Sequence, residues 1–419
     1  MDFTALVINI TVGAGILGLP SKLYLLLGSN SLWAVAGTAV FILILILCFA
    51  EVGSRFNNTG GAYLYAKLNY GGIIGFLAGW LLWLSRLFSF ASVCNLLVDY
   101  TGYLWPAATV NQMRILIVIA VTTLLGLLNL FGIRPATLVN NLLTVIKLIV
   151  LIAFVSFGLM HMHAVAHPVT VPFKWSAFLS GSLLLVFAFS GFDVAAIPAG
   201  EVKNPQRNIP KGLLISIAVV ALLFMGIQWV CIGTLPNLAH STKPVADAAS
   251  RFIGPTGAFI ITIGALVTVA GTLNALMLTS SRLLFAMAEQ QQLPSFLVRL
   301  NKRYHTPVWS IVVSGGVILL LTIQNNFVTA LTFSAIIRLF TFITTCLALP
   351  LMRRKGSNAP FKVQGGVILA IIAITACLIL FFNIGYREAL GALTASVAGL
   401  LIYGVYYSFS FNRRYQKNI

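Results

Sequence analysis

Two apolar stretches of this chain are long enough to cross a lipid bilayer, yet each is interrupted near its middle. The first, residues 4–27, has the sequence TALVINITVGAGILGLPSKLYLLL, with Gly13, Gly15, Gly18 and Pro20 close together. In a helix interior, glycine costs about 1 kcal/mol and proline about 3 kcal/mol relative to alanine. Within hydrocarbon, such a break survives only where the freed backbone lines a cavity or meets a ligand.

The second interrupted stretch lies half a chain away, at residues 175–202. Ser190 and Gly191 fall near its middle, and Pro198 and Gly200 near its end. Two interrupted spans in corresponding positions are typical of transporters whose substrate site is built from broken helices at mid-membrane. The sequence therefore predicts a substrate site made largely of backbone from both breaks. The competing interpretation is that the glycines only permit close helix packing.

The composition excludes an ordinary soluble domain. Hydrophobic residues make up 59% of the 419 residues and charged residues 8%, with a mean hydropathy of +0.99, whereas globular proteins carry about 25% charged residues. The net charge of +18 is distributed over the ends of apolar spans, which argues against a nucleic-acid partner and for topological signals in a bilayer.

Metal and redox chemistry have little support in the sequence. The five cysteines lie in apolar stretches without a CxxC pair, which is typical of buried small residues. His161, His163 and His167 fall in a polar connection with no acidic residue near in sequence. We therefore expect no metal site and no cofactor.

At about 20 apolar residues per crossing, the chain is predicted to be an all-α polytopic membrane protein with twelve transmembrane helices. The expected spans are 4–27, 32–55, 71–101, 112–132, 136–160, 175–202, 210–235, 255–288, 307–324, 327–352, 362–384 and 388–410. A cytoplasmic N-terminus places seventeen Lys and Arg residues in inner connections and six in outer ones. Positive charge favours the cytoplasmic side, so both termini are expected there, in a bacterial inner membrane.

The hydropathy pattern also predicts an internal repeat. Each block of five spans opens with a broken span, and an odd number of spans inverts the second copy relative to the first. We expect one domain, 1–419, with inverted repeats at approximately 1–160 and 175–352 and additional helices at 362–384 and 388–410.

Several ordered motifs carry a resemblance to the amino acid–polyamine–organocation (APC) permeases over almost the whole chain. They are VGAGILGLP at 12–20, AEVGSRFNNTGGAYLY at 50–65, FAFSGFDVAAIPAGEVKNPQRNIPKG at 187–212, TSSRLLFAMAEQQQLP at 279–294 and RRKGSNAPFK at 353–362. The resemblance implies amino acid transport. It also implies the five-plus-five inverted repeat of sodium-coupled leucine transporters, with helices 1 and 6 broken.

The backbone at the two breaks supplies the predicted binding groups. A half-helix that begins near Gly15 presents unpaired N–H groups and a positive dipole end to an anion. We assign five residues of the first break to the substrate carboxylate: Val12, Gly13, Ala14, Gly15 and Ile16. At the second break, around Gly191, the carbonyls of Phe187, Ala188 and Ser190 are expected to hold the substrate ammonium, as in the amino-acid grip of the family.

Lys147 lies near the centre of the fifth span, where a charged lysine costs roughly 2.5–3.5 kcal/mol on insertion scales. It should therefore face the protein interior and meet carbonyls. The resemblance suggests that it bridges the broken first span and the eighth span in the place of a sodium ion. A structural tie and a proton carrier remain compatible roles for it.

Other charged residues are weaker candidates. Asp193 and Glu51 match acidic positions in the family motifs and are grouped with Lys147 as coupling candidates. Asp193 could pair with a cation or cap the second half-helix. Glu51 with Arg55 is interpreted as an inner gate or a loop tether. Arg86 and Arg338 are central in their spans and should each face an internal partner, which the sequence does not name.

Phe189 and Phe192 flank the second break and could occlude the site as a gate, or simply pack in the core. Asn274, Thr279 and Ser280 of the eighth span are low-weight candidates for the pocket, because small polar residues often bond to their own helix.

The leading functional hypothesis is a secondary active transporter that moves neutral, apolar amino acids by alternating access, coupled to protons. Its alternatives are a cationic amino acid or polyamine exchanger and a non-transporting amino acid sensor. The sequence contains no GxxxxGK[ST] loop and no convincing set of catalytic residues, so ATP-driven transport and an enzyme activity are not expected. The predicted partners are an amino acid, protons and the lipid bilayer, and the oligomeric state is open.

Overall fold

The computed structural model describes residues 3–56, 61–131, 136–162, 172–195, 205–356 and 359–417. Within these ranges the regular structure is helical, apart from one isolated bridge between Leu300 and Pro307. Four residues singled out in the sequence (Pro198, Gly200, His163 and His167) lie outside the described residues.

The helices of the first half follow the predicted spans closely. They are α1 (Phe3–Thr11), α2 (Ala14–Leu27), α3 (Ser31–Gly53), α4 (Gly61–Tyr70), α5 (Gly72–Leu104), α6 (Asn111–Phe131), α7 (Ala136–Met160), α8 (Trp175–Ala188) and α9 (Phe192–Ala195). The first predicted span is thus two helices, and the sixth divides into α8 and α9.

In the second half of the chain, each predicted span corresponds to one unbroken helix. The helices of this half are α10 (Pro205–Thr234), α11 (Pro244–Phe252), α12 (Pro255–Glu289), α13 (Val308–Gln324), α14 (Phe327–Arg354), α15 (Gly366–Phe382) and α16 (Tyr386–Lys417). α11 is a nine-residue helix between the seventh and eighth predicted spans. The ten-residue α4 is too short to span a bilayer.

Local sequence explains where several helices begin. Gly254, with φ of 78°, precedes Pro255 at the first turn of α12, where proline is favoured because its missing N–H would be unpaired anyway. Asn326 caps α14: its side chain accepts from the Thr329 N–H at 2.9 Å, and the Thr329 hydroxyl accepts from the Asn326 N–H at 3.1 Å. This reciprocal pair satisfies two donors that the helix terminus would otherwise leave free.

Among the described residues, seven helical stretches are long and apolar enough to cross a membrane, and four further apolar helices are shorter. Large apolar side chains are exposed on their outer faces, including Leu222, Phe382 and Leu401. Exposed apolar surface on this scale suits a lipid environment.

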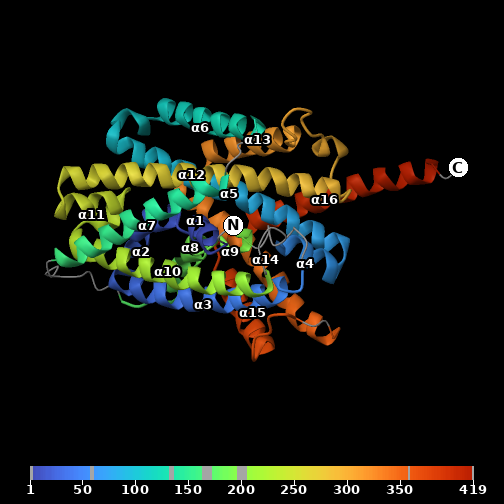
Figure 1. Cartoon of the computed structure of the whole chain (residues 1–419), viewed down its shortest axis with the longest axis horizontal. Coiled ribbons are helices and arrows are strands. Elements are labelled where there is room, and N and C mark those ends of the chain that lie inside the picture. The colour runs from blue at the N-terminus through green and yellow to red at the C-terminus, as the bar shows by residue number, and fades with distance from the viewer. Residues whose placement is uncertain are drawn as a thin grey trace.

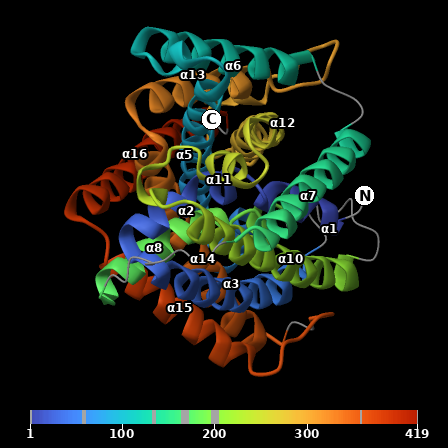
Figure 2. The ribbon, with the colours of Figure 1, turned by 90° about the vertical axis from the view of Figure 1, so that its left-hand side faces the viewer.

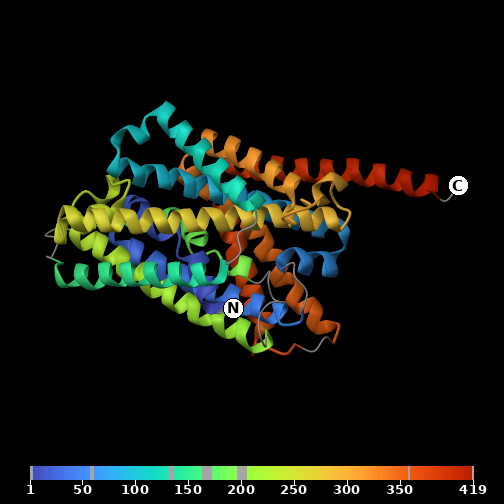
Figure 3. The same ribbon diagram turned by 45° about the horizontal axis from the view of Figure 1, so that its top comes forward.

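The long helices run mainly side by side along the long axis of the molecule (Figure 1). Viewed from the end, α6 and α13 lie together at one edge, and α15 lies at the opposite edge beside α3 and α14 (Figure 2). α16 extends past the bundle towards the C-terminus (Figure 3). α5 and α14 pack against each other and are mostly buried, whereas α6 and α16 are mostly exposed. The broken helices are surrounded by this bundle.

Candidate functional site

The first break separates α1 from α2 at Val12 and Gly13. The Gly13 N–H donates to the Thr11 carbonyl at 2.9 Å. Among the described residues, no side chain caps the N-terminus of α2 at Gly13. The first N–H groups of a helix have no intrahelical acceptor. The start of α2, at Ala14 and Gly15, therefore presents main-chain donors and the positive end of a helix dipole.

The second break separates α8 from α9 at Phe189, Ser190 and Gly191. Gly191 has a φ of +141°, which side chains rarely tolerate. The Phe187 carbonyl, which was predicted to hold the substrate ammonium, accepts from the Ser190 N–H at 3.1 Å and from the Ser190 hydroxyl at 2.5 Å. Because both lone pairs of the Phe187 carbonyl oxygen are engaged, the carbonyls of Ala188 and Ser190 are the better candidates to bind a substrate ammonium.

The two breaks pack directly against each other. A Cβ added to Gly15 would lie 2.7 Å from the Cα and Cβ atoms of Ala188, and one added to Gly191 would lie 2.7 Å from the Thr11 hydroxyl. Both distances are too short for a real side chain. The glycines thus allow close packing of the half-helices, whatever else they do.

A cavity lies where the breaks meet. Its lining comes from both breaks and from three other helices (α5, α12 and α14): Asn9, Ile10, Thr11, Gly13, Ala14, Gly15, Ser89, Val93, Phe187, Ala188, Ser190, Gly191, Gly271, Thr272, Ala275, Leu276, Thr279 and Arg338. The donors at the start of α2 and the backbone after α8 therefore share one cavity. This arrangement can hold a small molecule that carries both an anionic and a cationic group.

Lys147 of α7 is 5% exposed, and it meets carbonyls as its depth in the span predicted. Its Nζ donates to the carbonyls of Asn9 and Val12, both at 2.9 Å. These carbonyls belong to the C-terminal end of α1 and the residue after it, where a helix lacks donors and a cation is favoured. Lys147 also borders a small cavity together with Thr268 of α12.

Asp193 and Arg338 form an ion pair. Asp193 is thus the internal partner of Arg338 that the sequence did not identify. Arg338 Nη1 lies 3.0 and 3.1 Å from the two Asp193 carboxylate oxygens, and its Nη2 donates to the Ser89 hydroxyl at 3.2 Å. Asp193 also accepts from the Gly191 N–H at 3.1 Å. The carboxylate therefore stabilises the second break and ties it to α14.

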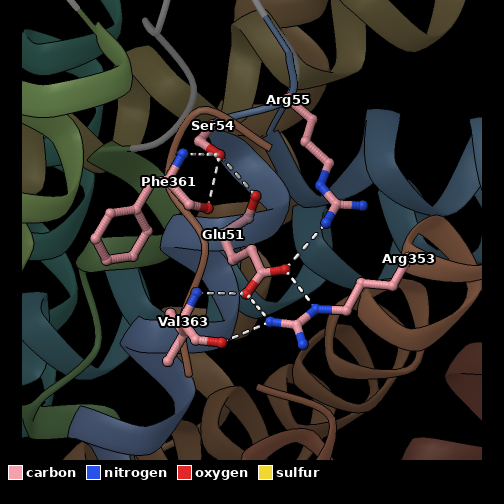
Figure 4. A network of polar contacts seen from close by, with 6 residues as sticks. All are labelled: Glu51, Ser54, Arg55, Arg353, Phe361 and Val363. Atoms are coloured by element: carbon pink, nitrogen blue, oxygen red, sulfur yellow. Dashed lines mark hydrogen bonds and ion pairs between the residues drawn. The ribbon is translucent and has the colours of Figure 1, made fainter. Parts of the chain in front are cut away.

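Glu51 lies in a different network, at the end of α3 (Figure 4). Its carboxylate accepts from Arg55 Nη2 at 3.0 Å, from Arg353 Nε and Nη2 at 2.8 and 2.6 Å, and from the Val363 N–H at 2.9 Å. Ser54 adds contacts of 3.4 Å to the backbone of Phe361. Glu51 does not line the cavity, and the network tethers the loop between α14 and α15 to α3.

The short helix α4 packs at the same end of the bundle. Tyr63 donates its hydroxyl to the Gln292 side-chain oxygen at 2.6 Å, and Tyr70 donates to the Thr344 carbonyl at 2.8 Å. Burial raises the pKa of Tyr63 to about 12, so its hydroxyl keeps its proton at physiological pH. α4 thereby joins the loop after α12 and the last turns of α14.

Of the residues predicted to bind substrate or to line the pocket, six do not line the cavity: Val12, Ile16, Phe189, Phe192, Asn274 and Ser280. Phe192 packs with Phe49 and Phe342, at ring-centroid distances of 5.3 and 5.4 Å, and Phe189 packs on Phe224. Here the aromatic pair belongs to the core and not to the wall of the site.

The polar candidates of α12 divide in the same way. The Asn274 side chain accepts from Asn129 of α6 at 3.0 Å, and the Ser280 hydroxyl bonds back to its own helix at 3.1 Å. Thr279 does line the cavity, although its hydroxyl also donates to a carbonyl one turn earlier at 2.8 Å.

Sequence reasoning missed several lining residues, among them Thr11, Ser89 and Thr272. Small polar side chains in apolar spans usually bond within their own helix, so nothing in the sequence marks these three. Arg338 was marked by its charge, and its position in the cavity wall was not predictable without its neighbours.

Comparison with known proteins decides the family. A model of the amino acid permease family matches residues 1–406 of the chain. The chain belongs to the amino acid permease family. This permease is 25% identical to the branched-chain amino acid permease BcaP of Bacillus subtilis, over 99% of the chain and 93% of the relative.

Two further relatives differ in the substrates that their names state. The methylthioribose transporter of Bacillus subtilis is 24% identical over 97% of this permease and 92% of its own length. The vacuolar cationic amino acid transporter 4 of Arabidopsis thaliana is 28% identical over 75% of this permease and 56% of its own length. The relatives are transporters and not enzymes, and they do not agree on one substrate.

Proposed function

We propose that this permease is a secondary active transporter that moves neutral, apolar amino acids by alternating access. The observation that carries the proposal is the shared cavity of the two breaks. The N–H groups at Ala14 and Gly15 suit a carboxylate, and the carbonyls of Ala188 and Ser190 suit an ammonium. Together they match the two charges that every amino acid carries.

The charges near the cavity support a neutral substrate over a cationic one. Arg338 lines the cavity, and Asp193 is already paired with it. A substrate with a second ammonium would therefore meet a guanidinium, and the described residues of the cavity wall offer no free carboxylate to offset the repulsion. The branched-chain permease among the relatives agrees with this choice. A cationic amino acid or polyamine exchanger is accordingly the less favoured alternative.

Lys147 is our proposed coupling residue. It holds two carbonyls at the end of α1, so a change in its protonation would alter how that half-helix is held. Asp193 and Glu51 would then act as ties, the first between the second break and α14, the second between α3 and the loop before α15. Coupling to protons follows from this assignment.

The arrangement proposed for the membrane follows the sequence. All twelve predicted ranges contain helix in the described residues, which supports twelve crossings. The breaks in the first and sixth spans are compatible with one domain of two inverted repeats, approximately 1–160 and 175–352. Both termini would be cytoplasmic, in a bacterial inner membrane.

Uptake by the purified permease in proteoliposomes tests the proposal. We expect accumulation of radiolabelled leucine under an inward proton gradient, with or without sodium, and loss of accumulation when an ionophore dissipates the gradient. Lysine and putrescine should compete poorly. A strict sodium requirement would contradict proton coupling, and binding without transport in any gradient would favour the sensor alternative.

A further inference from the structure

Arg86 and Arg338 form a buried basic pair beside the cavity. Arg86 lies on α5 and is 1% exposed, while Arg338 lies on α14 and is 3% exposed. Arg86 Nη1 donates to the carbonyl of Thr279, a residue of the cavity wall, at 3.0 Å, and Arg338 is itself in that wall. The Arg338 side chain therefore lies in the wall of the space in which the substrate is proposed to bind, and the Arg86 guanidinium lies directly behind that wall, against Thr279.

The two cations share a single carboxylate. Within the described part of the chain, Asp193 is the acidic residue that pairs with Arg338 and acts electrostatically on Arg86. Glu51 is engaged by Arg55 and Arg353 at the end of α3. Since arginine does not lose its proton in proteins, this cluster carries one surplus positive charge.

The hydrogen-bonding capacity of the pair is also unfilled. Arg86 Nε and Nη2 and Arg338 Nε are buried and have no acceptor among the described residues. A buried charged donor without a partner costs several kcal/mol. Neighbouring hydroxyls do not remove the surplus charge, because Ser85, Ser89 and Ser334 are neutral and bond mainly to one another.

We propose that Arg86 and Arg338 form an anion subsite of the cavity that takes one negative charge. This inference rests on the proposed function, because it concerns the same cavity. The charge has two possible sources. One is a small inorganic anion, such as chloride, that binds beside a neutral amino acid. The other is the side-chain carboxylate of an acidic amino acid, which would replace the neutral substrate class proposed above.

Proteoliposomes with wild-type permease distinguish these sources. Leucine uptake is measured with chloride or with gluconate, and glutamate is compared with glutamine as a competitor. Uptake that needs chloride identifies the free anion, whereas preference for glutamate identifies the substrate carboxylate. Uptake that is indifferent to chloride, with no preference for glutamate, overturns the subsite and leaves amino acid transport standing.

Arg86→Gln removes the surplus charge and leaves the pair of Asp193 and Arg338 intact. We expect the chloride dependence or the glutamate preference to fall by about thirtyfold, the equivalent of losing a buried charged contact. Arg86→Lys keeps the charge and should retain most of the effect. Arg114→Gln is the matched control, because Arg114 bonds to Asn95 and does not line the cavity. An unchanged preference in Arg86→Gln refutes the proposal.

A second measurement does not depend on transport. Chloride or glutamate alone should raise the thermal unfolding temperature of the detergent-purified wild type and should do so much less for Arg86→Gln, since a ligand stabilises the state that binds it. An equal rise in both proteins would refute the subsite. A rise confined to the wild type, in a protein that transports no amino acid, would retain the subsite and reject the transport function.

Discussion

Replacing Lys147 by methionine is the sharpest test of how the first break is held. Methionine keeps most of the length of the side chain and removes its ammonium. The Nζ of Lys147 donates to the carbonyls of Asn9 and Val12 at 2.9 Å, and the side chain is buried. The variant leaves both carbonyls without this donor.

The size of the effect follows from those two contacts. A buried acceptor that loses its donor costs about 1–3 kcal/mol. For two carbonyls, the arrangement in which α1 is held against α7 should therefore be destabilised by about 2–6 kcal/mol. The lower value corresponds to a factor of about thirty in the population of the binding-competent arrangement. We therefore expect the affinity for leucine to fall by at least about thirtyfold.

Two assays separate the roles of Lys147. Equilibrium binding in detergent reports the tie between α7 and α1, and accumulation in proteoliposomes under a proton gradient reports coupling. Loss of both identifies a structural tie, and normal binding without accumulation identifies the proton carrier. Lys174→Met, at an exposed position before α8, is the control. Wild-type affinity together with wild-type accumulation in Lys147→Met would refute both roles.

Three further results are expected. Glu51→Gln should destabilise the contact between α3 and the loop between α14 and α15 by about 3–5 kcal/mol, because it leaves two arginines without their carboxylate. Amide exchange in that loop should become faster, whereas Glu289→Gln, at an exposed position, should leave the exchange unchanged. Gly15→Ala should lower thermal stability and leucine affinity together, because the added Cβ has no room. Gly126→Ala is the control and should be neutral or stabilising, because a Cβ there meets no atom within 4 Å. Equal effects of the two substitutions would refute the packing argument. Finally, leucine accumulation should survive replacement of sodium by choline.

The helices were largely predictable because their cause is local. A run of apolar residues must become a helix in a bilayer, where each backbone group needs a partner within the same segment. Glycine and proline mark where that rule is broken, so the interruptions at Gly13 and at Gly191 were predicted from sequence. The depth of Lys147 likewise predicted main-chain carbonyls as its partners, without naming Asn9 and Val12.

The pairing of charges depended on contacts between distant segments. Asp193 and Arg338 are separated by 145 residues, and Glu51 and Arg353 by 302. No periodicity relates such positions, because their proximity arises from the packing of α9 on α14 and of α3 on α14. The sequence identified each residue as costly to bury, and the fold determined which residue offsets that cost.

The division of roles around the breaks also belongs to the tertiary structure. Hydropathy alone determined that this chain is a helical membrane protein with two defective spans, because transfer of side chains and backbone into lipid depends on residue type and order. Only the packed structure decided that Phe189 and Phe192 join the core, that Ser190 takes up the Phe187 carbonyl, and that Arg338 faces the cavity. The direction of a side chain depends on how its helix is rotated against its neighbours, and that rotation is set by contacts along the whole bundle.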